Sequence, residues 1–173
     1  MVGDDWTSAG PAVPPTARLE LCPLRVEHAD EMAVVLGDPR LHAFIGGEPD
    51  DAERLRARYR RMTAGSPRPD EVWLNWVVRL RDEDRLVGTV QATVVGRTAE
   101  IAWVVGVPWQ GRGIAREAVG ALVDRLSSGP VDALVAHIHP DHIASAAVAR
   151  SAGLSPTDRW HDGEIRWELR LAP

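Results

Sequence analysis

The spacing of apolar side chains predicts strands in five stretches of the chain. Runs that alternate between apolar and polar residues, or that are rich in β-branched residues, are typical of strands. Such runs lie at residues 18–24, 72–80, 86–95, 98–105 and 131–139. The connections between the three central runs have the length of hairpin loops, so we predict that these runs form an antiparallel meander.

Helical spacing, with apolar residues three or four positions apart, occurs in four further stretches. They lie at residues 27–36, 50–62, 114–126 and 143–152. Each carries an apolar stripe of the kind that packs on a core. Near the C-terminus, Asp162-Gly163 stands between Trp160 and Trp167, which predicts a hairpin within residues 157–171.

The order of these elements, β-α-α-β-β-β-α-β-α-β-β, indicates one mixed α/β domain over residues 16–173. Residues 1–15 are rich in Gly, Pro and Ala and lack periodicity, so we expect a flexible tail there. Residues 41–49, which contain Phe44, are expected to form a loop. The crossover from residues 98–105 through a helix to residues 131–139 implies a locally parallel pair of strands.

A glycine-rich turn joins the last strand of the meander to the helix at residues 114–126. The strand is expected to run on to Val107 and to end at Pro108, which has no N–H to donate to a neighbouring strand. The turn that follows reads Gln110-Gly111-Arg112-Gly113-Ile114-Ala115. Unpaired amides at the positive end of a helix dipole favour a phosphate ligand, so we predict a phosphate site here.

Two common phosphate-binding motifs do not fit this turn. A P-loop ends in Gly-Lys-Ser or Gly-Lys-Thr, and the chain contains no lysine. A dinucleotide-binding fingerprint needs a third glycine, and Arg116 stands at that position. The strands before the turn are also predicted to be hairpins rather than members of a parallel set.

Composition narrows the class of protein and its surroundings. The chain has 173 residues, of which 45% are hydrophobic and 26% charged, as is ordinary for a globular domain. Its formal net charge of −5 and the lack of a basic stripe argue against a nucleic-acid partner. The sequence has no long apolar run that would cross a membrane, and residues 1–15 lack the features of a signal peptide. With Cys22 as the single cysteine, we expect a cytoplasmic protein.

The turn and its surroundings resemble the GNAT superfamily of acetyl-CoA-dependent N-acyltransferases. The branch that includes the ribosomal-protein N-terminal acetyltransferases is the most similar. Residues 110–115 match the family's Gln-x-x-Gly-x-Ala motif, residues 139–145 resemble its Pro-x-Asn-x-x-Ser segment, and residues 150–154 resemble its Leu-Gly-Phe helix ending. The resemblance implies a mixed, mostly antiparallel sheet of about six or seven strands, splayed between two central parallel strands and flanked by about four helices.

The same resemblance implies which residues hold acetyl-CoA. The strand before the turn would bind the pantetheine arm through its backbone, with an amide at Val104 or Val105 facing the thioester oxygen. Amides of the turn would hold the pyrophosphate, and His142, which stands where the family has Asn, would contact pantetheine. The expected cofactor residues are Val104, Val105, Val107, Gln110, Gly111, Arg112, Gly113, Ile114, Ala115 and His142. The phosphate charges would be met by Arg112 or Arg116, or these side chains would be solvated.

The resemblance also implies direct attack of an amine on the acetyl thioester in a ternary complex. The family's usual Tyr acid falls at Ala149, so Ser145 is the candidate acid; the alternative is that Ser145 caps the helix. Glu100 is the candidate base, directly or through water; the alternative is a surface carboxylate paired with Arg. His142 acting as a base is a further alternative.

Other functions stay open at the level of the sequence. The acceptor is a primary amine, either a protein N-terminus or a small molecule, and the protein is expected to be a monomer or a homodimer. The missing Tyr and the substituted Asn favour, as an alternative, a catalytically weak acyl-CoA-binding module. A metal site on His137, His139 and His142 is a third hypothesis, but no cysteine or helical His pair completes it, so we predict no metal.

Overall fold

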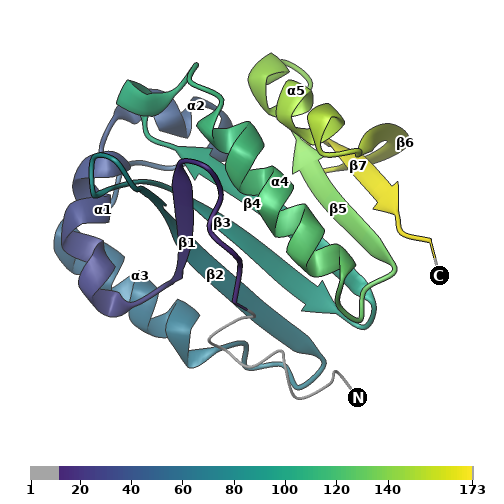
Figure 1. Ribbon diagram of the computed structural model, residues 1–173, viewed down its shortest axis with the longest axis horizontal. Coiled ribbons are helices and arrows are strands. Elements are labelled where there is room, and N and C mark those ends of the chain that lie inside the picture. Colours follow the sequence, from purple (N-terminus) through teal and green to yellow (C-terminus); the bar gives the residue numbers. More distant parts are fainter. Residues whose placement is uncertain (1–11, 173) are drawn as a thin grey trace.

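A computed structural model describes residues 12–172, which form a seven-stranded sheet with helices on both faces (Figure 1). The strands are β1 (Leu19–Pro23), β2 (Glu71–Leu80), β3 (Arg85–Val95), β4 (Thr98–Val105), β5 (Ala133–Ile138), β6 (Ser155–His161) and β7 (Glu164–Arg170). The α-helices are α1 (Ala29–Val35), α2 (His42–Ile45), α3 (Ala52–Ala64), α4 (Ile114–Ser127) and α5 (Ile143–Ser151).

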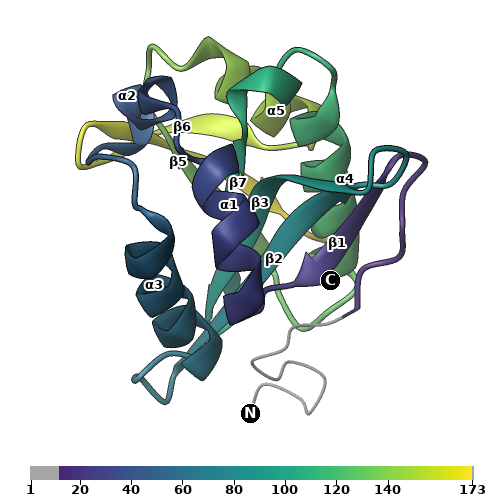
Figure 2. The same ribbon diagram turned by 90° about the vertical axis from the view of Figure 1, so that its left-hand side faces the viewer.

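The sheet separates two hydrophobic cores. Helix α4 lies across β3 and β4 with α5 beside it, and its buried stripe packs on the larger core (Figure 1). That stripe consists of Ile114, Ala118, Val119, Leu122, Val123 and Leu126. Helices α1 and α3 cover the opposite face of β2 and β3 (Figure 2) and bury a smaller core around Met32, Leu55 and Tyr59. None of the described helices is long and apolar enough to cross a lipid bilayer.

The strand order β1-β2-β3-β4-β5-β7-β6 contains one parallel pair, β4 with β5. All other neighbouring strands are antiparallel. The parallel pairing covers only three residues of each strand, from Thr98 opposite Ala133 to Glu100 opposite Val135. Beyond Glu100 the two strands separate, so the second half of β4 borders a gap. The predicted fold class, with its splayed central pair, is confirmed.

The structure departs from the sequence prediction at three places. Strand β4 ends at Val105 rather than Val107, because Val107 begins a 3₁₀ turn (Val107–Trp109) whose closing hydrogen bonds replace strand pairing. The predicted loop at residues 41–49 contains the one-turn helix α2. Most of the predicted tail, residues 1–11, lies outside the described residues. Val13 is 7% exposed and belongs to the larger core, so the packed chain extends at least that far.

Candidate active site

A groove of about 360 Å³ opens where β4 and β5 separate, between the start of α4, the α2 turn and α5. Most of the residues predicted from the sequence lie together along it: Val104, Val105, Gln110, Gly111, Gly113, Ile114, Ala115, His142 and Ser145. Glu100, Val107 and Arg112 do not line it. The predicted cofactor residues are therefore mostly neighbours in space, and the candidate base Glu100 lies apart from them.

The glycine-rich turn presents a row of amides without partners. Gly111 and Gly113 have φ angles of 74° and 76°, which glycine adopts without strain. Among the described residues, the amides of Gly111, Arg112 and Gly113 donate no hydrogen bond within the protein. The next three amides belong to the first turn of α4 and have no acceptor in the helix. A Cβ built on Gly111 meets nothing within 4 Å, so the turn is open on that side. This arrangement fits a pyrophosphate group.

Two hydrogen bonds fix the end of β4 beside this turn. The Gln110 side-chain Nε2 donates to the Val105 carbonyl at 3.0 Å, and the Gly106 amide donates to Val87 of β3 at 2.8 Å. Hydrogen-bonded and non-hydrogen-bonded pairs alternate along an antiparallel ladder, so the amides of Trp103 and Val105 point away from β3 and toward the gap. Val104 pairs with Thr89 of β3 and directs its amide there. Of the two amides expected at the thioester oxygen, that of Val105 faces the gap.

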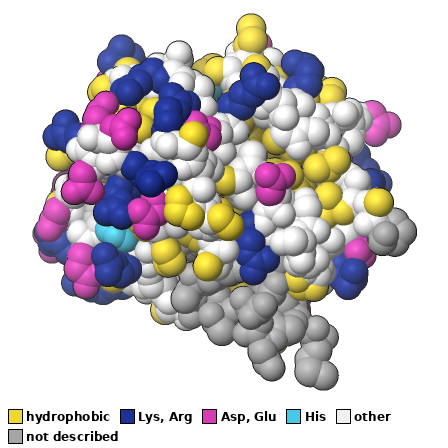
Figure 3. All heavy atoms as spheres, viewed as in Figure 1, with side chains coloured by type: hydrophobic (Ala, Val, Ile, Leu, Met, Phe, Trp, Pro, Cys, Tyr) yellow, Lys and Arg dark blue, Asp and Glu magenta, His cyan; other side chains and the backbone are white. Residues whose placement is uncertain are grey.

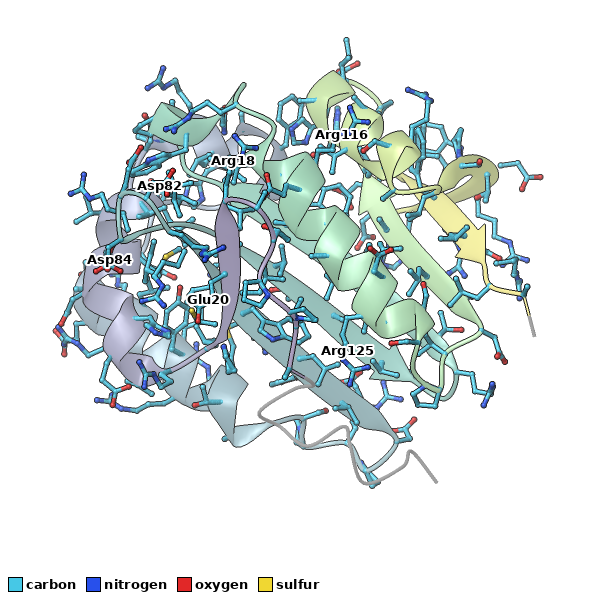
Figure 4. The ribbon with its side chains drawn as sticks, viewed as in Figure 1. Arg18, Glu20, Asp82, Asp84, Arg116 and Arg125 are labelled. Carbon is cyan, nitrogen blue, oxygen red and sulfur yellow. The ribbon has the colours of Figure 1, made fainter. Side chains whose placement is uncertain are left out.

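Two of the three predicted residues outside the groove, Arg112 and Val107, make other contacts. Arg112 reaches Glu83 in the β2–β3 connection at 3.3 Å, while Arg116 lines the groove (Figure 4). The Val107 carbonyl accepts the Gln110 amide at 3.2 Å inside the 3₁₀ turn. Of the two arginines considered for the phosphates, only Arg116 therefore lines the groove.

Ser145 and His142 contact each other at the start of α5. The Ser145 hydroxyl lies 3.3 Å from His142 Nε2, and α5 has no side-chain hydrogen bond at its N-cap. The alternative in which Ser145 caps the helix is therefore not the arrangement in this structure. Burial, and then the nearby charge of His139, lower the pKa of His142 below its usual value, so its imidazole is neutral at neutral pH.

The α2 turn forms the wall of the groove opposite α5. The Phe44 ring stacks on the His142 ring, with centroids 4.2 Å apart and planes inclined by 5°. Ile45, Trp103 and Trp109 add to the apolar lining. No role was predicted from the sequence for Phe44, Ile45 or Trp109. The only feature of the sequence that could have pointed to Phe44 as a site residue is its position, as an aromatic residue in a loop shortly before Gly46-Gly47.

Glu100 and His137 form a separate polar pair on β4 and β5. Glu100 Oε1 lies 2.9 Å from His137 Nδ1, and the two residues border a shallow open depression that also contains Trp160 and His161. The carboxylate thus pairs with histidine rather than with arginine. Among residues 12–172, no three His, Cys, Asp or Glu side chains come together in a way that would hold a metal ion. The three histidines of the metal hypothesis do not form such a group.

Comparison with known proteins identifies the family. A family model described as an acetyltransferase (GNAT) domain matches residues 18–155. The chain therefore belongs to the GNAT acetyltransferase family, as the glycine-rich turn and the segment at residues 139–145 indicated. No curated protein matches the chain.

Solved structures show the same fold at low sequence identity. A GNAT-family acetyltransferase from Bacillus anthracis is 18% identical, with a TM-score of 0.77 over 91% of this chain and 97% of that chain. A Salmonella typhimurium acetyl transferase that modifies the N-terminal serine of ribosomal protein L7/L12 is 16% identical, with a TM-score of 0.74 over 92% and 99%. Spermidine N-acetyltransferase from Vibrio cholerae, solved with CoA and spermine, is 15% identical, with a TM-score of 0.72 over 90% and 96%. At these identities the likeness concerns the fold alone.

Proposed function

We propose that this protein transfers the acetyl group of acetyl-CoA to a primary amine by direct attack in a ternary complex. The observation that carries the proposal is the groove itself, in which amides of a glycine-rich turn adjoin a strand edge, both without partners among the described residues. A nucleotide pyrophosphate suits the amides, and the amide groups of a pantetheine arm suit the strand edge. The Spermidine N-acetyltransferase of the same fold was solved with CoA, which supports this assignment.

The cofactor half of the site uses mainly backbone groups. Amides of the turn, from Gly111 to Ala115, bind the pyrophosphate, and Arg116 adds positive charge at the groove. Trp103 and Val105 offer the backbone groups of β4, and the Val105 amide donates to the thioester oxygen. Bound acetyl-CoA supplies the activated acetyl group. The free amine forms a C–N bond as the C–S bond breaks; the nitrogen loses one proton and the sulfur gains one.

Ser145 is the proposed acid. Its hydroxyl lies on the groove and in contact with a neutral histidine, so it is held toward the site rather than toward solvent. The hydroxyl gives its proton to the departing sulfur, and His142 orients it through Nε2. His142 contacts pantetheine from the same place, where Phe44 fixes the plane of its ring.

Glu100 is the proposed base and acts through water. Its side chain is 54% exposed, which leaves room for solvent beside the carboxylate. His137 restrains one of its oxygens at 2.9 Å. Because Glu100 does not line the groove, direct contact with the amine is disfavoured and a water path is the route that this placement supports.

The cellular location, oligomeric state and partners that we propose are based on the sequence and the surface. We propose a cytoplasmic monomer or homodimer that uses acetyl-CoA without a metal and has no nucleic-acid or membrane partner. Side chains of both signs are interspersed over the face that carries α4 (Figure 3), which supports the proposed absence of a nucleic-acid partner. A protein surface that binds nucleic acid usually concentrates positive charge.

The decisive experiment measures acetyl-CoA binding by calorimetry and thiol release over a panel of amines. We expect binding of acetyl-CoA and turnover with at least one amine. Binding of acetyl-CoA without turnover on any amine would instead support the acyl-CoA-binding module, and absence of binding would overturn both functions. Gly111→Val tests the role of the turn. A β-branched residue is strained at the positive φ of position 111, so this substitution is expected to weaken acetyl-CoA binding.

A further inference from the structure

A second cavity, of about 130 Å³, lies on the other side of the sheet, against α3. Ile45 and Val104 line both this cavity and the groove, so the two spaces adjoin at the end of β4. On the proposed function the thioester lies beside the end of β4, so an amine held in this cavity would reach it at this junction. The cavity is thus placed to hold the part of an acceptor that lies behind its amine.

The floor of the cavity is polar and has free hydrogen-bonding capacity. The strand register sets Asn75 opposite Gln91 and Thr89 opposite Val104, so these side chains share the face of the sheet that α3 covers. Among the described residues, the side chains of Asn75, Thr89 and Gln91 make no hydrogen bond. Their polar atoms are therefore available to hydrogen-bond a ligand.

Tyr59 contributes a buried donor from α3. The residue is 3% exposed, and its hydroxyl has no hydrogen-bond partner within the described residues. Burial raises the pKa of Tyr59 to about 12, so the hydroxyl keeps its proton. A buried hydroxyl without a partner destabilises the fold, and a ligand that pairs with it removes that cost. The surrounding walls are apolar, with Leu24, Leu36, Leu55 and Met62.

The charges at the cavity are already balanced. Of the residues that the structure describes, Asp50 is the only acidic one that lines the cavity, and its carboxylate lies 3.3 Å from the Arg58 guanidinium. A polyamine carries several positive charges and would need several free carboxylates. The lining therefore favours an acceptor with one amine and an uncharged body.

We propose that this cavity binds the acceptor, and that the acceptor is a compact monoamine with an apolar body and a hydrogen-bonding group at the end away from the amine. The inference rests on the proposed function and specifies its substrate class. Such pockets are apolar with a few placed polar groups, which is the composition seen here. The buried Leu55 and Tyr59 side chains close the cavity on the α3 side, so a compact molecule fits better than an extended chain.

The test compares two monoamines that differ by one hydroxyl, tyramine and phenethylamine, with spermidine and a short serine-starting peptide. Binding of each to the CoA-loaded protein is measured by calorimetry, and acetylation by thiol release. We expect both monoamines to bind more tightly than spermidine or the peptide, and tyramine about fivefold more tightly than phenethylamine because of one added hydrogen bond. Tighter binding of spermidine or the peptide would overturn the proposal, as would failure of both monoamines to bind.

Two variants locate the binding in this cavity. Tyr59→Phe is expected to fold at least as stably as the wild type, because the hydroxyl that it removes has no partner. It should remove the fivefold preference for tyramine and leave phenethylamine binding unchanged. Met62→Trp should fill the cavity and weaken both amines at least tenfold at unchanged CoA affinity, with Met62→Leu as the volume-matched control.

The possible failures are distinguishable. If the protein binds CoA and acetylates an amine but both variants behave as the wild type, the acceptor site is elsewhere and the proposed function stands. If the wild type binds no CoA, the proposed function fails together with this inference. Thermal unfolding of each variant shows whether a loss of binding reflects a loss of fold.

Discussion

At the scale of single residues, the site departs from the family's pattern at two positions, those of the usual Tyr and the usual Asn. The family's Tyr position holds Ala149, which is fully buried in the larger core and has no proton to give. The family's Asn position holds His142, which contacts Ser145 and stacks on Phe44. An imidazole in the neutral state has one donor and one acceptor nitrogen, so it is able to hold a hydroxyl while its ring packs on an aromatic surface.

Replacing Ser145 tests whether its hydroxyl acts in the reaction. Ser145→Ala should lower kcat by about 100-fold, the lower range for loss of a general acid, while the melting temperature changes little. Steady-state kinetics at saturating acetyl-CoA and thermal unfolding provide the two measurements. Ser145→Thr keeps a hydroxyl and serves as the control. If Ser145→Ala loses activity only in proportion to its loss of folded protein, the residue is structural.

The pKa of His142 predicts a pH dependence of stability. Its pKa is lower in the folded protein than in the unfolded chain, so the unfolded chain binds more protons as the pH falls below about 6.5. The stabilisation is present above that value and is lost as the pH falls toward the folded-state pKa. Urea denaturation at pH 5 to 8 should therefore show a steeper loss for the wild type than for His142→Asn. Parallel curves would contradict the lowered pKa.

At the scale of elements, one carboxylate ties the segment just before β1 to the start of α4, beside the glycine-rich turn. Glu117, in the first turn of α4, accepts hydrogen bonds from the Thr16 hydroxyl at 2.5 Å and from the Arg18 amide and Nε at 2.9 and 2.8 Å. The Arg18 guanidinium also donates to the Arg112 carbonyl at 2.8 Å, which places it beside the turn (Figure 4). Burial alone would raise the pKa of Glu117, but these hydrogen bonds outweigh burial and lower it.

Glu117→Gln should loosen this connection. The loss of hydrogen bonds to a charged group is expected to lower the free energy of unfolding by about 2 kcal/mol. Affinity for CoA should fall, while affinity for acetylpantetheine, which lacks the pyrophosphate, should not. Calorimetry with both ligands separates a local effect on the turn from general destabilisation.

Arg97→Gln is the matched control for this prediction. It breaks the exposed ion pair between Arg97, in the β3–β4 connection, and Asp132, just before β5. Exposed pairs contribute little because solvent screens them, so the free energy of unfolding and the CoA affinity of this variant should both stay close to those of the wild type. If Glu117→Gln lowers the affinity for CoA and the affinity for acetylpantetheine by the same factor, the carboxylate does not act through the turn.

The sequence predicted the longer elements and missed those without periodicity. Asp162-Gly163 was predicted to turn a hairpin and does so, with φ angles of 49° and 79° that such two-residue turns require. Helix α2 has only four residues, too few to show a helical repeat. Val107 continues the β-branched pattern of β4, but Pro108 already enforces the turn that includes it.

Contacts between residues far apart in the chain could not be predicted from the sequence. Spacing placed Glu100 and His137 on separate strands, but the contact between them depends on the register of the parallel pair. The same holds for Phe44 and His142, which are brought together only when the α2 turn folds over the groove. The gap between β4 and β5 was expected from family resemblance, since no apolar pattern encodes where two strands stop pairing.

At the scale of the whole molecule, CoA is expected to stabilise the fold. A ligand that binds only the native state adds free energy in proportion to the logarithm of its concentration over Kd, about 2.7 kcal/mol at 100 times Kd. Urea unfolding with and without CoA at that ratio measures the gain. Gly111→Val should gain far less at the same CoA concentration. An identical gain in both proteins would place CoA away from the turn.

The short pairing between β4 and β5 has a consequence for how copies of the protein behave in concentrated solution. From Ile101 to Val105 the strand has backbone groups that no neighbouring strand satisfies, so the middle of the sheet contains an edge. A pantetheine arm that pairs there completes the ladder much as an added strand would. Without it, the edge is free to pair with an extended segment of another molecule. We therefore expect ligand-free protein to aggregate sooner than CoA-loaded protein on gentle warming, even where both remain folded.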